Sequence, residues 1–174
     1  KWRANNCWYI VITFYIFMTF DLIIVGAGMA GLPCAICAAQ RELNVLLIEA
    51  TNEIGGKLLQ STGQIAAACS NIQSRKGIKD SKEAHLKEAW KICKGTADLK
   101  LLRLAIDNAG ETINWLENIG VKFPESNPVI TYQHDIYSTK RYHWPIEKGQ
   151  GILDAIKPLL KKYILRNKIT LFKN

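Results

Sequence analysis

Apolar positions in the first third of the chain form two continuous runs, at residues 20–25 and 44–48, with a helix-forming stretch at 29–41 between them. Short continuous apolar runs are typical of buried parallel strands. Pro33 lies in the first turns of the stretch between them, where a helix best tolerates a missing N–H. The pattern predicts a strand–helix–strand unit of an α/β fold with a parallel sheet.

Two helices in succession are predicted in the middle of the chain. Residues 80–94 begin with capping-box spacing, and residues 96–119 carry apolar side chains at intervals of three and four until Gly120 ends the pattern. On the first of these helices we expect three polar side chains to face solvent, namely His85, Glu88 and Lys91.

Shorter elements complete the prediction. A short strand is expected at 129–132, a helix at 152–165 despite Pro158, and a strand at 169–172. Residues 50–72 form a connection rich in Gly, Ser, Thr and Ala, and long connections of this kind usually carry function. The polar, aromatic and basic segment 134–144 is interpreted as a surface loop, with a substrate-facing segment as the alternative.

The turn after the first apolar run has the glycine spacing of a dinucleotide-binding turn. Gly26, Gly28 and Gly31 form a GxGxxG pattern, with Ala27 and Ala30 between them. The first glycine permits a tight turn, the second lets the backbone approach phosphates, and the third lets the helix lie close to the sheet. Backbone N–H groups and the helix N-terminus would then bind a pyrophosphate. An ordinary strand–helix turn is the structural alternative.

Glu49, followed by Ala50, closes the second apolar run. An acid at the end of the second strand can accept hydrogen bonds from the ribose hydroxyls of an adenosine, and it disfavours the 2′-phosphate of NADP. Strand, turn, helix, strand and acid together predict a bound dinucleotide. The glycine turn alone does not distinguish FAD from NAD, so a nicotinamide-binding domain remains an alternative.

Charge and cysteine content bear on the expected partners and on the cellular location of the protein. The chain has 174 residues, is 48% hydrophobic and carries a net charge of +8. No block of like charges and no nucleic-acid motif is present, so no nucleic-acid partner is expected; a positive field suits a phosphate-bearing cofactor. Five cysteines without disulfide spacing suggest a cytoplasmic protein with reduced thiols. The pair Cys34 and Cys37 is interpreted as small residues that pack a helix on the sheet. Scattered histidines give no metal site.

The first 17 residues are apolar and aromatic. Their apolar stretch is shorter than the ~20 residues that a membrane-spanning helix needs, and no cleavage site follows it. We expect residues 1–17 to be an upstream extension before a start at Met18, and residues 18–174 to be the N-terminal part of one dinucleotide-binding domain, which the resemblance given next identifies as FAD-binding. A membrane anchor is the less favoured alternative.

Six segments together give the chain a family resemblance. It resembles the FAD-binding domain of the fumarate reductase and succinate dehydrogenase flavoproteins, which include 3-oxosteroid dehydrogenase-like members, through residues 21–31, 47–50, 55–57, 61–67, 77–81 and 113–121. The resemblance implies a Rossmann-like fold and a flavoprotein oxidoreductase that moves a hydride between flavin N5 and a C–C bond of a small-molecule substrate. An electron-transfer partner is also implied.

The same resemblance implies flavin contacts in the loop after Glu49. By position these contacts would be Gly55, Gly56, Lys57, Ser61, Thr62, Gly63 and Gln64. Some family members bind FAD covalently through a His in this loop, but residues 50–84 contain no His, so non-covalent FAD is expected. Gln64 stands where a second glycine is common. The catalytic Arg and His of the family lie in later sequence, so no catalytic residue is assigned.

Two other functions remain open. The run Gly55–Gly56–Lys57 also resembles the amine oxidase and carotenoid desaturase group. The chain ends two residues after its last predicted strand and looks like an N-terminal fragment, truncated before a capping domain. It could therefore bind FAD or NAD without activity of its own.

Overall fold

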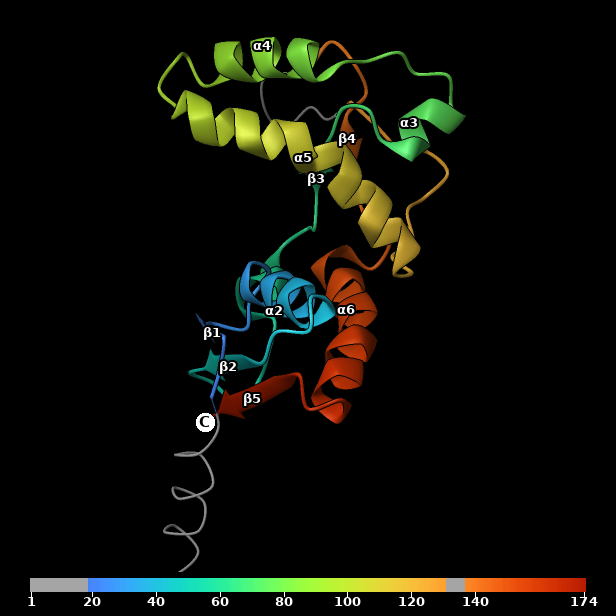
Figure 1. The fold of residues 1–174 in the computed structure, drawn as a ribbon. Coiled ribbons are helices and arrows are strands. Elements are labelled where there is room, and N and C mark those ends of the chain that lie inside the picture. The colour runs from blue at the N-terminus through green and yellow to red at the C-terminus, as the bar shows by residue number, and fades with distance from the viewer. Residues whose placement is uncertain (1–18, 131–136) are drawn as a thin grey trace, which may run out of the picture. The chain divides into compact units, whose positions relative to one another are not determined.

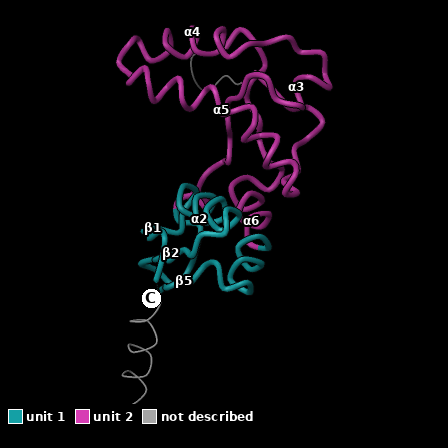
Figure 2. Tube along the Cα trace, viewed as in Figure 1, with its two compact units in different colours: residues 1–56, 158–174 teal, residues 57–157 magenta. Residues whose placement is uncertain are grey.

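The computed structural model describes residues 19–130 and 137–174, and its chain divides into two compact units (Figure 1, Figure 2). The first unit comprises Lys1–Gly56 and Pro158–Asn174, and the second comprises Lys57–Lys157. The prediction of a single FAD-binding domain over 18–174, with 1–17 as an extension, stays a prediction; residues 1–17 lie outside the described part.

The first unit is a strand–helix–strand layer. Strands β1 (Leu22–Val25), β2 (Val45–Glu49) and β5 (Ile169–Lys173) form a parallel sheet in the order β1-β2-β5, and helix α2 (Gly31–Gln40) crosses between the first two. In β1 and β2, Leu22 pairs with Val45 and Val25 with Ile48. The predicted parallel α/β unit is confirmed, with boundaries within two residues of those expected.

One face of this sheet is packed and the other is open among the described residues. Helix α2 buries Ala35, Ile36 and Ala39. On the opposite side of the strands, Ile23 is 60% exposed and Val25 is 82% exposed. The expectation of a β1 strand buried on both faces is therefore wrong for the described chain, because α2 covers one face only and side chains alternate along a strand.

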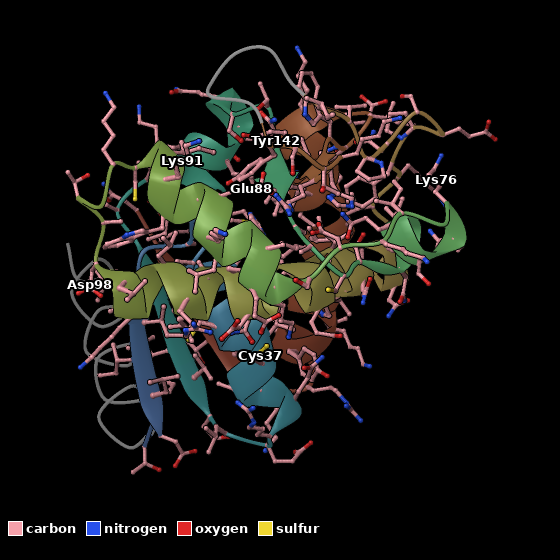
Figure 3. The ribbon with its side chains drawn as sticks, turned by 90° about the horizontal axis from the view of Figure 1, so that it is seen from above. Cys37, Lys76, Glu88, Lys91, Asp98 and Tyr142 are labelled. Atoms are coloured by element: carbon pink, nitrogen blue, oxygen red, sulfur yellow. The ribbon has the colours of Figure 1, made fainter. Side chains whose placement is uncertain are left out.

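The two cysteines of α2 lie on its solvent side. Cys34 and Cys37 are free and exposed, so the interpretation that they pack the helix on the sheet is wrong. Figure 3 labels Cys37. Alanines and isoleucine at the neighbouring positions make that contact instead.

The second unit is mainly helical. Helices α4 (Lys82–Ile92) and α5 (Leu99–Asn118) pack against each other, and strands β3 (Ile65–Ala66) and β4 (Tyr142–His143) form an antiparallel pair beside them. The connection predicted at residues 50–72 is not irregular throughout, because it contains the 3₁₀ helix η1 (Gly56–Gln60) and the start of helix α3 (Asn71–Arg75). Helix α5 ends as predicted, since Gly120 follows it with φ +104°.

Two later elements differ from the prediction. Helix α6 (Lys148–Leu165) begins four residues before the expected start at 152 and continues from the second unit into the first. The expected strand at 129–132 is reduced to one bridge between Val129 and Tyr142, and residues 131–132 lie outside the described part.

Helix α4 turns a different face inward than its sequence pattern suggests. His85 is only 2% exposed, and Glu88 is half-buried against Arg141, whereas Lys91 is exposed (Figure 3). The prediction that all three face solvent is wrong for the first two. The Glu88 carboxylate faces inward because it pairs with Arg141, which lies more than 50 residues later in the chain. The pattern of apolar residues within α4 contains no information about such a distant partner.

Candidate functional site

The glycine turn joins β1 to α2 with almost no space between strand and helix. Gly26 has φ +101°, and its N–H donates to the Ile48 carbonyl at 2.7 Å, which extends the β1–β2 pairing into the turn. A Cβ atom placed on Gly31 would lie 1.9 Å from the Gly26 carbonyl oxygen. Glycine is therefore required at position 31 for the helix to start this close to the strand.

The start of α2 presents backbone donors without acceptors. Its N-cap residue is Ala30, which has no side chain able to cap the helix. Within residues 19–130 and 137–174, no group accepts a hydrogen bond from the N–H of Gly28, Met29 or Ala30. A Cβ on Gly28 would meet no atom within 4 Å. The turn thus offers open N–H groups and the positive end of a helix dipole.

Glu49 is tied to this turn by its carboxylate. Its Oε2 accepts a hydrogen bond from the Ala27 N–H at 2.8 Å, and its Oε1 accepts one from the Thr51 N–H at 3.0 Å. The hydrogen bonds from Ala27 and Thr51 lower the pKa of Glu49 below its usual value. The carboxylate is therefore ionised at neutral pH, and its oxygens keep lone pairs for further donors.

The glycine pair after β2 lies against the same turn. The Gly55 N–H donates to the Ala27 carbonyl at 2.8 Å, and both Gly55 and Gly56 have positive φ, +109° and +50°. A Cβ on Gly56 would lie 3.8 Å from the Cα of Gly28. The first unit thus brings together nine of the predicted contacts, which are Gly26, Ala27, Gly28, Ala30, Gly31, Glu49, Ala50, Gly55 and Gly56.

The remaining predicted contacts belong to the second unit. The Ser61 hydroxyl donates to the Leu58 carbonyl at 2.9 Å and accepts from the Gly63 N–H at 3.2 Å, which fixes a compact loop. The exposed Lys57 donates its Nζ to Gln60 at 3.1 Å. Thr62 is exposed, and Gln64 has a buried Nε2 without a hydrogen-bond partner among the described residues.

The first turn of α6 packs on this loop, a contact that the sequence analysis missed. A Cβ on Gly149 would lie 1.9 Å from the Leu58 carbonyl oxygen, and the Gly149 N–H donates to the Ser61 carbonyl at 3.3 Å. A Cβ on Gly63 would in turn lie 3.0 Å from the Gly149 nitrogen. The only sequence signal for this contact is the Gly–Gln–Gly run at 149–151.

An ionic cluster stabilises the β4 side of the second unit. Arg141 is fully buried and donates through Nε and Nη2 to both carboxylate oxygens of Asp80, at 2.7 and 2.6 Å. Its Nη1 lies 3.0 Å from Glu88. Burial alone would raise the pKa of Asp80, but hydrogen bonds from Arg141 and Gln73 outweigh burial and lower it.

His143 forms a second buried polar contact. Its Nδ1 lies 2.7 Å from the Arg141 carbonyl oxygen and must donate the proton there, so its Nε2 accepts from the Ser70 hydroxyl at 2.8 Å. Burial lowers the pKa of His143. With Arg141, His143 and Tyr137 all buried, the interpretation of 134–144 as a surface loop is wrong for its described part.

Comparison with protein families matches residues 21–153 to the family described as "FAD binding domain". The matched segment covers more than half of the chain and includes every glycine of the turn. The chain belongs to this FAD-binding domain family. FAD is therefore the cofactor, as the sequence analysis predicted, rather than a nicotinamide dinucleotide.

The relatives of this FAD-binding domain are flavoprotein oxidoreductases of the fumarate reductase type. The chain is 36% identical over 103 residues to an NADH:fumarate oxidoreductase of Klebsiella pneumoniae, a match that covers 59% of the chain. It is 30% identical over 147 residues to a vinyl phenol reductase of Lactiplantibacillus plantarum, a match that covers 83% of the chain. The predicted family resemblance is confirmed.

The fold agrees with these relatives. A flavocytochrome c3 fumarate reductase structure superposes with a TM-score of 0.77 at 22% identity, covering 99% of the chain and 30% of the longer protein. The matches span 11% of the Klebsiella relative and 28% of the Lactiplantibacillus relative. The FAD-binding domain thus corresponds to the FAD-binding part of much longer oxidoreductases.

Two further kinds of feature are absent from the described residues. No helix there is long and apolar enough to cross a membrane. Nor does the described part contain a group of three or more His, Cys, Asp or Glu placed to hold a metal ion.

Proposed function

We propose that this domain binds FAD non-covalently, with the pyrophosphate at the start of α2 and the adenosine ribose on Glu49. The observation that carries the proposal is the row of N–H groups at Gly28, Met29 and Ala30, which lack acceptors in the described chain. The space beside Gly28 is open, because a Cβ placed there would meet no atom within 4 Å. Such donors at a helix N-terminus suit a phosphate group.

Each group of the first unit has a distinct role in this proposal. Glu49 is ionised, and its Oε2 accepts a hydrogen bond from the Ala27 N–H. Each carboxylate oxygen has two lone pairs, so Glu49 can also accept a hydrogen bond from a ribose hydroxyl. Gly55 and Gly56 lie against the turn without a side chain between them and it. Ala30 and Ala50 contribute small side chains that leave room for the cofactor.

Residues of the second unit are proposed to complete the binding of the flavin half. Ser61 and Gly63 use their hydroxyl and N–H within the loop and, together with Gly149, fix its shape, which leaves the exposed Thr62 hydroxyl to donate to the cofactor. Gln64, whose Nε2 has no hydrogen-bond partner in the described chain, stands at a position that the family resemblance assigns to a flavin contact. Lys57 would supply positive charge near the ring.

The reaction proposed for the whole protein is hydride transfer to or from a C–C bond of a small molecule. Bound FAD supplies this two-electron chemistry at N5, while the chain described here holds and orients it. Support comes from the names of the relatives, because fumarate and vinyl phenols both carry a carbon–carbon double bond. An electron-transfer partner and a cytoplasmic location, the latter inferred from the free thiols, belong to the same proposal.

An anaerobic experiment tests the reaction. The protein that carries this domain is loaded with FAD, reduced with dithionite and then mixed with fumarate or with a vinyl phenol. Return of the oxidised flavin spectrum with one of these compounds, and not with a saturated analogue, is the expected result. If the flavin binds and reduces but no activated alkene reoxidises it, the proposed reaction is wrong while FAD binding stands.

The non-covalent attachment has its own test. Acid denaturation of the yellow protein followed by centrifugation is expected to leave all flavin in the supernatant. Flavin that remains with the precipitated chain would contradict this part of the proposal.

A further inference from the structure

Helix α2 carries two cysteines on a single exposed stripe. Its exposed positions are Cys34, Cys37 and Gln40, which recur every three residues, whereas the residues between them are buried. Residues three apart in a helix are neighbours on one face, with Cβ atoms about 5–6 Å apart. The thiols of Cys34 and Cys37 therefore lie side by side on the surface of the described chain.

Both thiols of this pair are free of contacts that would occupy them. Neither Sγ has a hydrogen-bond partner within residues 19–130 and 137–174, and both cysteines are unpaired there. The other two thiols of the described chain each have an acceptor. Cys69 donates to the Asp80 carbonyl at 3.6 Å, and Cys93 donates to the Trp90 carbonyl at 3.3 Å. Solvent access is a condition for a reactive thiol, and both members of the α2 pair have it.

The spacing of the pair favours a bridging atom over a disulfide. A disulfide requires Cβ atoms about 3.5–4.5 Å apart, which is closer than neighbours three residues apart on a regular helix. A single atom bonded to both sulfurs spans a wider gap, because it adds a second bond to sulfur of about 2.3 Å, the length found at zinc. The two thiols are thus placed to bind one shared atom while α2 keeps its helical geometry.

The number of ligands decides which thiophilic atom fits. A structural zinc site takes four protein ligands and a catalytic one takes three. No group of three or more His, Cys, Asp or Glu that could hold a metal ion occurs in the part of the chain that the structure describes. A monosubstituted trivalent arsenical, R–As=O, is a soft centre that bonds two thiolates, and soft sulfur ligands suit such a centre. Its two open valences match the two thiols.

We propose that Cys34 and Cys37 form a dithiol site that binds monosubstituted trivalent arsenicals. Each sulfur forms one As–S bond, and the two thiol hydrogens leave with the arsenical oxygen as one molecule of water. Arsenic stays trivalent throughout, so the step requires no oxidant or reductant. Both cysteines belong to the first unit, and neither is among the proposed FAD contacts, so the site does not depend on the proposed function.

Phenylarsine oxide is the probe for this site. It is titrated into the purified full chain, which has been reduced and freed of reductant, with an excess of a monothiol present to suppress binding to single cysteines. We expect intact mass to show one arsenical per chain and thiol titration to show two thiols lost for each arsenical bound. Retention of no arsenical, or the loss of only one thiol for each arsenical, would overturn the proposal.

Alanine variants assign the arsenical to α2. Cys34→Ala and Cys37→Ala each leave one thiol of the pair and introduce a strong helix former. Each is expected to bind at least about 100-fold more weakly, because the second As–S bond is intramolecular only when both thiols are present. The matched control replaces Cys7, Cys69 and Cys93 by alanine together and is expected to bind like the wild type.

Far-UV circular dichroism checks that each variant keeps its helices. Wild-type affinity in either single variant would refute the assignment to this pair. So would lost binding in the triple control with its helices intact, because the arsenical would then use one of the other thiols.

Discussion

Gly28 and Gly31 lie three residues apart in one turn, yet a methyl group has opposite consequences at the two positions. At Gly31 it would overlap the Gly26 carbonyl oxygen, whereas at Gly28 it would touch no protein atom. The close packing of strand and helix thus explains the glycine at position 31. No protein atom explains the glycine at position 28, which we attribute to the bound cofactor.

The pair gives a sharp prediction. Gly31→Ala is expected to lower the free energy of unfolding by about 3 kcal/mol, because strand and helix must separate. Gly28→Ala is expected to change it by less than about 0.5 kcal/mol but to weaken FAD binding about tenfold, since its Cβ occupies the space of the phosphate. Urea unfolding of the apoprotein and FAD titration measure the two effects. Normal FAD affinity in Gly28→Ala would contradict the proposed site.

Arg141 provides a second prediction at this scale. Replacing it with Met leaves the buried Asp80 carboxylate without its cation, which is expected to cost about 3–5 kcal/mol of unfolding free energy. Arg75→Met is the matched control, because Arg75 pairs with Glu117 at the surface and its loss should cost less than about 1 kcal/mol. Equal losses in urea unfolding of the two variants would refute the role given to the buried pair.

Neither Arg141 nor His85 was assigned correctly from sequence. The sequence pattern predicts a surface loop around Arg141 and a solvent-facing side chain for His85. Each is buried because of a partner far along the chain, Asp80 for the first and Tyr137 for the second. The periodicity of apolar residues predicts which side of a single helix or strand is buried, but it cannot predict pairs between residues far apart in the sequence.

Among the elements, the strand–helix–strand unit of β1, α2 and β2 was predicted closely because local signals define all of it. The glycine turn and the terminal acid are set by the backbone geometry of about 30 residues. By contrast, α6 begins earlier than predicted, since its first turn is fixed by contact with the distant 57–64 loop rather than by a strong local cap.

That contact predicts the effect of a side chain at the start of α6. Gly149→Ala would place a Cβ 1.9 Å from the Leu58 carbonyl oxygen, so we expect a loss of about 1–3 kcal/mol and a loosened loop at Ser61–Gln64. Gln150→Ala, one residue along on the exposed side, is the control. Hydrogen exchange of the loop amides measures the change; protection equal to that of the control would contradict the contact.

For the molecule as a whole, buried histidines predict an acid-sensitive fold. His85 has its pKa lowered to about 4, so between pH 6.5 and 4 the unfolded chain binds a proton that the folded chain does not. Stability is therefore full above pH 6.5 and falls as the pH drops, by about 3 kcal/mol for this group. The pKa of His143 is lowered in the same direction by burial.

Urea unfolding of the wild type and of His85→Leu at several pH values tests this. The variant is expected to lose less stability than the wild type between pH 6.5 and 4, because it lacks the His85 contribution and keeps only those of His143 and, toward pH 4, of the Glu49 and Glu88 carboxylates, whose pKa values are lowered. Asp80 acts at lower pH, since its carboxylate loses its stabilising contribution only as the pH falls below its usual value. Identical slopes in the two proteins would exclude His85 as a cause.

The central claim is that the open N–H groups of the glycine turn, with the Glu49 carboxylate beside them, hold FAD. Equilibrium dialysis of the folded protein against FAD, read by flavin absorbance, measures this directly. The account predicts one FAD bound per chain, with affinity reduced in Gly28→Ala while its unfolding curve stays that of the wild type. A folded protein that binds no FAD would contradict it.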